Sequence, residues 1–114
     1  MLFFGDKTEK IKKWGEKGKK DKLIKILTNG GNPKYRAEAA KALGNVKNLD
    51  VANILITYLR DPDAEVRANI IESLGKLRAK NAEEHIRRIY NSENDPKIKE
   101  VALNALNSIR NGLG

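Results

Sequence analysis

The feature that most constrains this chain is a sequence pattern that returns after 31 residues and again after 32. Each copy begins with an apolar residue followed by a cation, continues through a pair of small or apolar residues, and ends in Leu-Gly or Leu-Asn. The copies begin at Tyr35-Arg36, Val66-Arg67 and Ile98-Lys99. A fixed period of this length indicates a repeat protein, in which each unit buries its apolar face against the next.

An Asn or Asp followed by proline precedes each copy, and both residues favour the start of a helix. The pairs are Asn32-Pro33, Asp61-Pro62 and Asp95-Pro96. A short polar side chain accepts hydrogen bonds from the free amides of a first helical turn, and proline in the first position loses no intrahelical bond. Apolar residues then recur at intervals of three and four. These patterns predict helices over 33–46, 62–78 and 96–110.

A second set of helices is expected between the first. Asp50 and Asn81 stand where each could cap a helix, and the apolar residues after them match when shifted by 31 positions. One period earlier, the apolar residues Leu23 and Leu27 predict another helix near 19–29, which Gly30-Gly31 would end. Two alternating helices per repeat are therefore expected.

The amino-terminal segment is expected to close the first edge of the stack. Asp6 with Glu9 three residues later resembles a capping box, and the glycines at positions 15 and 18 would end the short helix. We expect the aromatic side chains near this end to cover the helix at 19–29. They are Phe3, Phe4 and Trp14.

The length of 114 residues suits one domain. We divide it into a cap at 1–18, the first helix of the second set at 19–31, repeats at 32–60 and 61–92, and a half repeat at 93–111. The expected fold class is all-α: a superhelix, or solenoid, of about three and a half helix pairs. Because nothing is predicted to cover the helix of the half repeat, we expect it to pack partly exposed in a monomer. A weak homodimer through the candidate contacts Leu103 and Leu106 is the second choice.

The segment 61–77, DPDAEVRANIIESLGKL, resembles the HEAT-like repeats named after phycocyanobilin lyase, with their Asp-Pro turn, Val-Arg and Leu-Gly. Residues 32–46 and 95–109 are similar, with Tyr35 for valine, Lys99 for arginine and Asn107 for glycine. The resemblance covers about residues 19–111 and implies the same α-α superhelix, with the tetratricopeptide fold as a minor alternative. Family members include bilin lyase subunits, deoxyhypusine hydroxylase and many scaffold proteins, so it implies no single activity.

Composition argues against several kinds of active site. The chain has no cysteine, which removes thiol catalysis and zinc-thiolate sites. Its one histidine, His85, falls on an apolar stripe and is followed by Ile86, whereas the hydroxylase type holds metal with several His-Glu pairs. We expect His85 to be neutral and mostly packed, and the protein to be non-catalytic, with no cofactor and no metal. The amino terminus has no long apolar segment, so we expect a cytoplasmic protein without membrane insertion.

The best candidate binding surface is the outward face of the second-row helices, which the resemblance places on the concave side of the superhelix. Its predicted partner-binding residues are Lys22, Lys25, Asn53, Ile56, Thr57, Arg60, Arg87 and Arg88. An apolar residue such as Ile56 on a basic face is a natural contact centre for a protein partner. The column Arg36, Arg67 and Lys99 is instead expected to form a structural ladder, bonding turn carbonyls or an acidic group of the adjacent repeat.

The net charge of +8 keeps a second function open. A basic inner surface could bind nucleic acid, although nine of the 23 basic residues are lysines within 7–25 and no aromatic side chain is clearly placed to stack on bases. The expected function is a protein-protein interaction scaffold with an unidentified protein partner. Nucleic-acid binding and a role as accessory subunit of a lyase-type enzyme are the alternatives.

Overall fold

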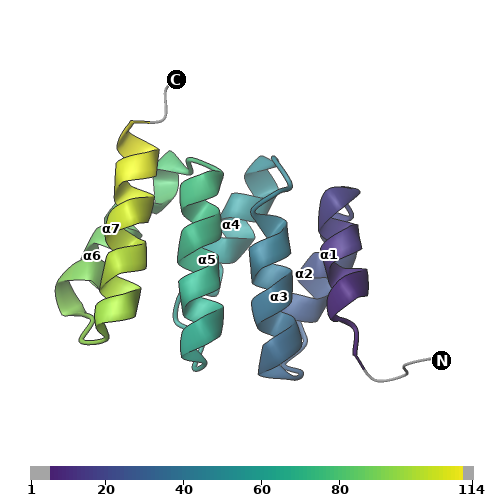
Figure 1. The fold of residues 1–114 in the computed structure, drawn as a ribbon. Coiled ribbons are helices and arrows are strands. Elements are labelled where there is room, and N and C mark those ends of the chain that lie inside the picture. Colours follow the sequence, from purple (N-terminus) through teal and green to yellow (C-terminus); the bar gives the residue numbers. More distant parts are fainter. Residues whose placement is uncertain (1–5, 112–114) are drawn as a thin grey trace.

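The computed structural model describes residues 6–111, which form two parallel rows of helices (Figure 1). The first row contains α1 (Thr8–Glu16), α3 (Pro33–Leu43), α5 (Ala64–Lys76) and α7 (Pro96–Arg110). The second row contains α2 (Lys20–Thr28), α4 (Leu49–Thr57) and α6 (Glu83–Ser92), which follows a 3-10 turn at Lys80–Ala82. The described residues contain no strand. This is the all-α superhelix that the repeat pattern predicts, and it measures 45 × 31 × 22 Å.

The core lies between the two rows and is continuous along the stack. Apolar residues at intervals of three and four on every helix point into it, as an amphipathic pattern requires. Its largest fully buried side chains include Ile11, Leu23, Leu43, Leu55, Ile71, Leu74, Ile86 and Ile109. Because each repeat supplies apolar residues to both of its neighbours, the stack has one core rather than one core per repeat.

Neighbouring first-row helices approach each other closely at three glycines. A Cβ atom at Gly15 would lie 2.9 Å from the Cβ of Ala42, and one at Gly75 would lie 2.9 Å from the Cα of Ala105. At Gly44 the nearest atom would be the Ser73 hydroxyl, at 2.6 Å. The absence of a side chain at these positions therefore sets the distance between helices.

The amino-terminal helix takes a place in the first row. Gly15 on α1 meets α3 in the way that Gly44, directly after α3, meets α5. Trp14 packs against the core and carries two lysine ammonium groups over its ring, those of Lys10 at 5.7 Å and Lys22 at 5.4 Å. Lys22 lies on α2, so Trp14 does contact the helix it is expected to cover, while Phe3 and Phe4 lie outside the described residues.

Two of the predicted helix starts are correct and one is displaced. The Asn32 and Asp95 side chains accept hydrogen bonds from the amides of Lys34 and Lys97, both at 2.9 Å. On α5, however, the capping residue is Asp63 rather than Asp61, because the Asp63 carboxylate accepts the Val66 amide at 3.1 Å. Asp61 is thereby available for another contact.

The remaining capping predictions are wrong in detail. Asn48, not Asp50, caps α4 and accepts the Asp50 amide at 2.8 Å. Asn81 lies inside the 3-10 turn before α6, and its side chain donates to the Asn53 side-chain oxygen at 2.8 Å. At the amino terminus, the Asp6 carboxylate accepts the Thr8 amide at 2.9 Å, and no reciprocal capping box with Glu9 forms.

Candidate functional site

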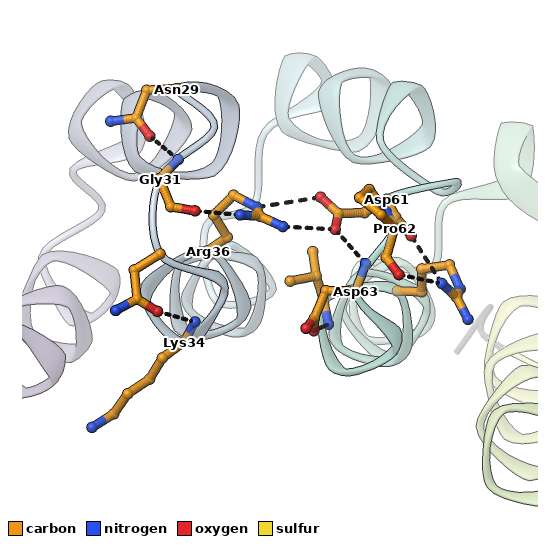
Figure 2. Close-up of polar contacts among 10 residues, drawn as sticks. Asn29, Gly31, Lys34, Arg36, Asp61, Pro62 and Asp63 are labelled. Carbon is orange, nitrogen blue, oxygen red and sulfur yellow. Dashed lines mark hydrogen bonds and ion pairs between the residues drawn. The ribbon is translucent and has the colours of Figure 1, made fainter.

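The contact between Arg36 and Asp61 joins one helix pair to the next (Figure 2). The Nη2 and Nε atoms of Arg36 donate to the two carboxylate oxygens of Asp61, at 2.9 and 3.4 Å. Its Nη1 donates to the carbonyl of Gly31 in the turn before α3. Both side chains are nearly buried, with 10% and 6% exposed, so the charges are paired and enclosed. This is the ladder contact expected of Arg36.

The same column changes its partners in the next repeats. The Nη1 atom of Arg67 donates to the carbonyls of Asp61 and Pro62, at 2.9 and 3.2 Å, which matches the turn contact expected of a ladder residue. Within residues 6–111, no carboxylate pairs with Arg67. Lys99 departs from the prediction, because its ammonium lies 4.7 Å from the Tyr90 ring centroid and forms no ion pair with a described residue. Lysine carries a single ammonium group in place of the forked guanidinium, and here that ammonium makes a cation–π contact in place of the ladder contact.

A pocket of about 500 Å³ opens between the carboxyl-terminal parts of α4 and α6, and residues of α5 and α7 complete its lining. We call it the α4–α6 pocket. Its lining combines aliphatic side chains with three arginines and one carboxylate. The lining residues are Ile56, Thr57, Leu59, Arg60, Arg67, Ile71, His85, Arg88, Ile89, Ser92, Glu93 and Ile98. An apolar floor with a cationic rim suits a ligand that is both aliphatic and anionic.

None of the predicted partner-binding residues is buried: six are exposed, while Ile56 and Arg87 are half-buried. The structure brings four of them together, since Ile56, Thr57, Arg60 and Arg88 line the α4–α6 pocket. Lys22, Lys25, Asn53 and Arg87 lie outside it. Lys22 contacts the Trp14 ring, and Asn53 accepts a hydrogen bond from Asn81, which ties α4 to the turn before α6.

Arg87 is held by carboxylates of its own helix and is therefore a poor contact for a partner. Its guanidinium pairs with Glu84 and, at 3.0 Å, with Glu83. Glu83 also accepts Nε of Arg110 at 3.3 Å, which connects α6 to the end of α7. The hydrogen bond from Arg110, followed by the bond and charge of Arg87, holds the pKa of Glu83 below its usual value.

Two pocket residues were assigned other roles from the sequence. His85 is exposed and lines the pocket, so the expectation of a mostly packed histidine is wrong; α6 begins at Glu83, after the 3-10 turn, and the helix turns this position outward. Arg67 was assigned to the ladder alone. When the observed capping residues Asn32, Asp63 and Asp95 are aligned, Glu93 takes the position of Asp61. The replacement of Asp by Glu at this position is the sequence signal that Arg67 differs from Arg36 in its partner.

A second hollow lies at the amino-terminal end of α4 and the carboxyl-terminal end of α5, where the turns within each repeat meet. It measures about 670 Å³ and is lined by basic and small residues, among them Lys47, Lys76 and Lys80. The Lys76 ammonium donates to the Asn45 side chain at 2.8 Å. Leu49 at its edge is 75% exposed.

The two residues predicted as a carboxyl-terminal contact differ in exposure. Leu103 on α7 is 43% exposed, but Leu106 is only 8% exposed because it faces the core. Leu106 is therefore not available as a contact in this structure. Leu103 is the one member of the predicted pair that the helix presents to solvent.

The described residues hold no group of three or more His, Asp or Glu side chains arranged to bind a metal ion. None of the helices within residues 6–111 is long and apolar enough to cross a bilayer.

Comparison with known proteins matches the fold across most of the chain. The family model for HEAT repeats matches residues 21–107. The structure of the complex of CpcE and CpcF of phycocyanin lyase from Nostoc sp. PCC7120 is similar with a TM-score of 0.74 and 26% identity, covering 90% of this chain and 47% of that chain. The crystal structure of an engineered protein is similar in fold, with a TM-score of 0.67 and 23% identity, over 92% of this chain and 51% of that one. The chain thus spans about half the length of both structures. No curated protein matches its sequence.

Proposed function

This chain belongs to the HEAT-repeat family, and on that premise we propose that it is a non-catalytic scaffold that binds a protein partner through the α4–α6 pocket. The observation that carries the proposal is the lining of the pocket, where Ile56 and Ile89 are half-buried between the exposed cations Arg60 and Arg88. Aliphatic centres with arginines at their edge are typical of protein contact sites.

Two further features support a binding role over a catalytic one. The pocket contains one histidine and one carboxylate, His85 and Glu93, and no cysteine; the Glu93 carboxylate already accepts the Asp95 amide at 3.2 Å. A nucleophile with a base within hydrogen-bond reach, which covalent catalysis needs, is missing from this lining. The pocket therefore offers recognition chemistry.

A photo-crosslinking experiment in the native host tests the proposal. A crosslinking amino acid placed at Thr57, in the lining of the pocket, should capture a partner that the same amino acid at Lys12, on α1, does not. The captured protein is then purified, and its affinity for the chain is measured by calorimetry. Replacing Ile56, Arg60 and Arg88 together by alanine should weaken that affinity by at least about a hundredfold, because each lost contact at an interface centre costs about 1 kcal/mol or more.

The matched control replaces three exposed first-row residues, Lys41, Glu72 and Asn104, by alanine. This triple variant should bind the partner as the unmodified chain does. If both triple variants bind equally well while remaining folded, the α4–α6 pocket is not the binding site.

A role as accessory subunit of a lyase-type enzyme is the second candidate function, and the similarity to the CpcE and CpcF complex favours it. It predicts that the captured partner is a lyase subunit or a phycobiliprotein. A host that makes no phycobiliproteins would exclude this role while leaving the scaffold proposal intact.

Nucleic-acid binding is tested in the same series by titrating duplex DNA at several salt concentrations. The acidic neighbours of Arg87 reduce the positive charge of the second-row face, which argues against a continuous track for phosphates. Binding that is tight at low salt and weakens steeply as salt rises would replace the scaffold proposal with this alternative.

A further inference from the structure

Arg36 and Arg67 occupy the same position in successive repeats but differ in the partners of their guanidinium groups. Both guanidinium groups place Nη1 on carbonyls of the turn before their helix. On Arg36 the other edge, Nη2 and Nε, is occupied by the Asp61 carboxylate. On Arg67 the same two atoms have no acceptor within the part of the chain that the structure describes. One repeat therefore fills the donor edge that the next leaves open.

The residue in the position of Asp61 one repeat later does not fill this edge. Asp61 lies 25 residues after Arg36 and serves two donors, since its Oδ1 also accepts the Asp63 amide at 2.9 Å. Glu93 lies 26 residues after Arg67 and accepts the corresponding amide, that of Asp95, at 3.2 Å. It forms no ion pair with Arg67 among residues 6–111. Glu93 thus keeps the turn contact and loses the ladder contact.

Arg67 lines the α4–α6 pocket, where it is half-buried beside the exposed cations Arg60 and Arg88. Glu93 is the single acidic residue of the lining. The lining therefore carries an excess of positive charge around an aliphatic floor that includes Ile71 and Ile89. A guanidinium with two adjacent free donors is the preferred receptor for a carboxylate, which it binds through two parallel hydrogen bonds.

We propose that the α4–α6 pocket binds an acidic side chain of a partner protein, with the carboxylate on Nε and Nη2 of Arg67 and a neighbouring aliphatic side chain on the floor of the pocket. The inference rests on the proposed scaffold function and names the chemistry of its partner. A side-chain carboxylate is favoured over a chain terminus because the group that occupies this place on Arg36 is itself a side chain, that of Asp61. Asp61 comes two residues after Leu59, so an aliphatic residue lies near the carboxylate in sequence. The partner segment replaces the carboxylate that the repeat lacks.

The test uses the intact chain labelled with ¹⁵N and follows the Nε–H signals of its arginines by NMR. The probe is the blocked dipeptide acetyl-Leu-Asp-amide, and its matched control is acetyl-Leu-Asn-amide, which has nearly the same shape without the charge. The Arg67 signal should shift saturably with the Asp dipeptide at millimolar concentration, while the Arg36 signal stays in place because Asp61 already occupies it. The Asn dipeptide should bind about tenfold more weakly, as expected for loss of a charged hydrogen-bond pair.

Two variants accompany the titration. Arg67→Gln should weaken binding of the Asp dipeptide by about tenfold. Arg110→Gln, which also removes one positive charge but at the carboxyl end of α7 and outside the pocket lining, should leave binding unchanged. Because the direct signal of Arg67 is read in the unmodified chain, the test holds even if Arg67→Gln unfolds.

Three results would overturn the inference. They are a shift of the Arg60 or Arg88 signals with none at Arg67, equal binding of the Asp and Asn dipeptides, and binding of acetyl-leucine, with its free carboxyl terminus, in preference to the Asp dipeptide. A partner captured from Thr57 that binds Arg67→Gln with unchanged affinity would refute the role of Arg67 alone. If the unmodified chain carrying the crosslinker at Thr57 captures no partner, the scaffold proposal is refuted instead.

Discussion

At the scale of single residues, one alignment column contains three different solutions. Arg36 is enclosed with a carboxylate, Arg67 holds only turn carbonyls, and Lys99 lies over the Tyr90 ring. A cation enclosed with its partner depends on that partner, because a buried charge left alone cannot recover its hydration. A half-buried cation on carbonyls keeps contact with water. The column therefore has unequal effects on stability although its sequence is nearly uniform.

This difference gives the first prediction. Arg36→Gln should lower the free energy of unfolding by about 3–5 kcal/mol, since it leaves the nearly buried Asp61 carboxylate unpaired. Arg67→Gln should cost about 1 kcal/mol, the typical value of a lost hydrogen bond to turn carbonyls. Urea unfolding followed by circular dichroism measures both. Equal losses for the two variants would show that Arg67 is as deeply integrated in the ladder as Arg36.

At the scale of elements, the repeat is spaced by small residues where first-row helices meet. The motif Leu-Gly was visible in the sequence at Leu43-Gly44 and Leu74-Gly75, but the reason for the glycine is the close approach of the next helix. Ser73, at one such meeting point, donates its hydroxyl to the carbonyl of Ala40 at 2.6 Å. Helix spacing and one buried hydrogen bond between repeats are thus set at the same place.

Gly75→Ala tests this spacing. Alanine gains about 0.5–1 kcal/mol over glycine in a helix interior, but the new Cβ would lie 2.9 Å from the backbone of Ala105, and overpacking of this kind costs about 1–3 kcal/mol. We expect the cost of overpacking to exceed the gain in helix propensity, so the unfolding midpoint in urea should fall. Asn107→Ala is the control, because Asn107 is exposed at the equivalent position of α7 and should gain slightly from helix propensity. A rise in stability for Gly75→Ala would mean that α5 and α7 separate easily.

The connection between α6 and α7 is expected to depend on pH. The pKa of Glu83 is lowered in the folded state, chiefly by the hydrogen bond from Arg110, so Glu83 stabilises the fold above its unfolded pKa. This contribution is lost as the pH falls through the lowered folded pKa. Glu83→Gln should therefore be less stable than the unmodified chain at pH 7, and the difference should vanish in acid.

Urea midpoints measured from pH 7 down to about pH 3 check this expectation. Glu72→Gln serves as the control, since Glu72 is exposed on α5 and forms no ion pair with any residue of the described range. A difference for Glu83→Gln that persists undiminished in acid would point to a packing role rather than a charge role.

At the scale of the whole molecule, the repeat predicted the two-row fold, while the site depended on details that a period does not encode. The positions of the helices followed from apolar spacing and Asx-Pro turns. Asp61 was misplaced because acidic residues stand on both sides of Pro62, and only the structure shows that Asp63 caps α5. His85 was misplaced because a 3-10 turn precedes α6.

The stack should also unfold as one unit, and Leu74 provides the test. Leu74 on the central helix α5 is fully buried, so Leu74→Ala should cost about 2–5 kcal/mol. Trp14 lies on α1 at one end of the stack, and its fluorescence reports that end, whereas circular dichroism reports all helices. Because every repeat shares the same core, both signals should shift to the same lower urea concentration. Lys12→Ala, at an exposed site on α1, should move neither signal. If Leu74→Ala shifts the dichroism but leaves the Trp14 transition in place, the amino-terminal pair folds independently of the rest.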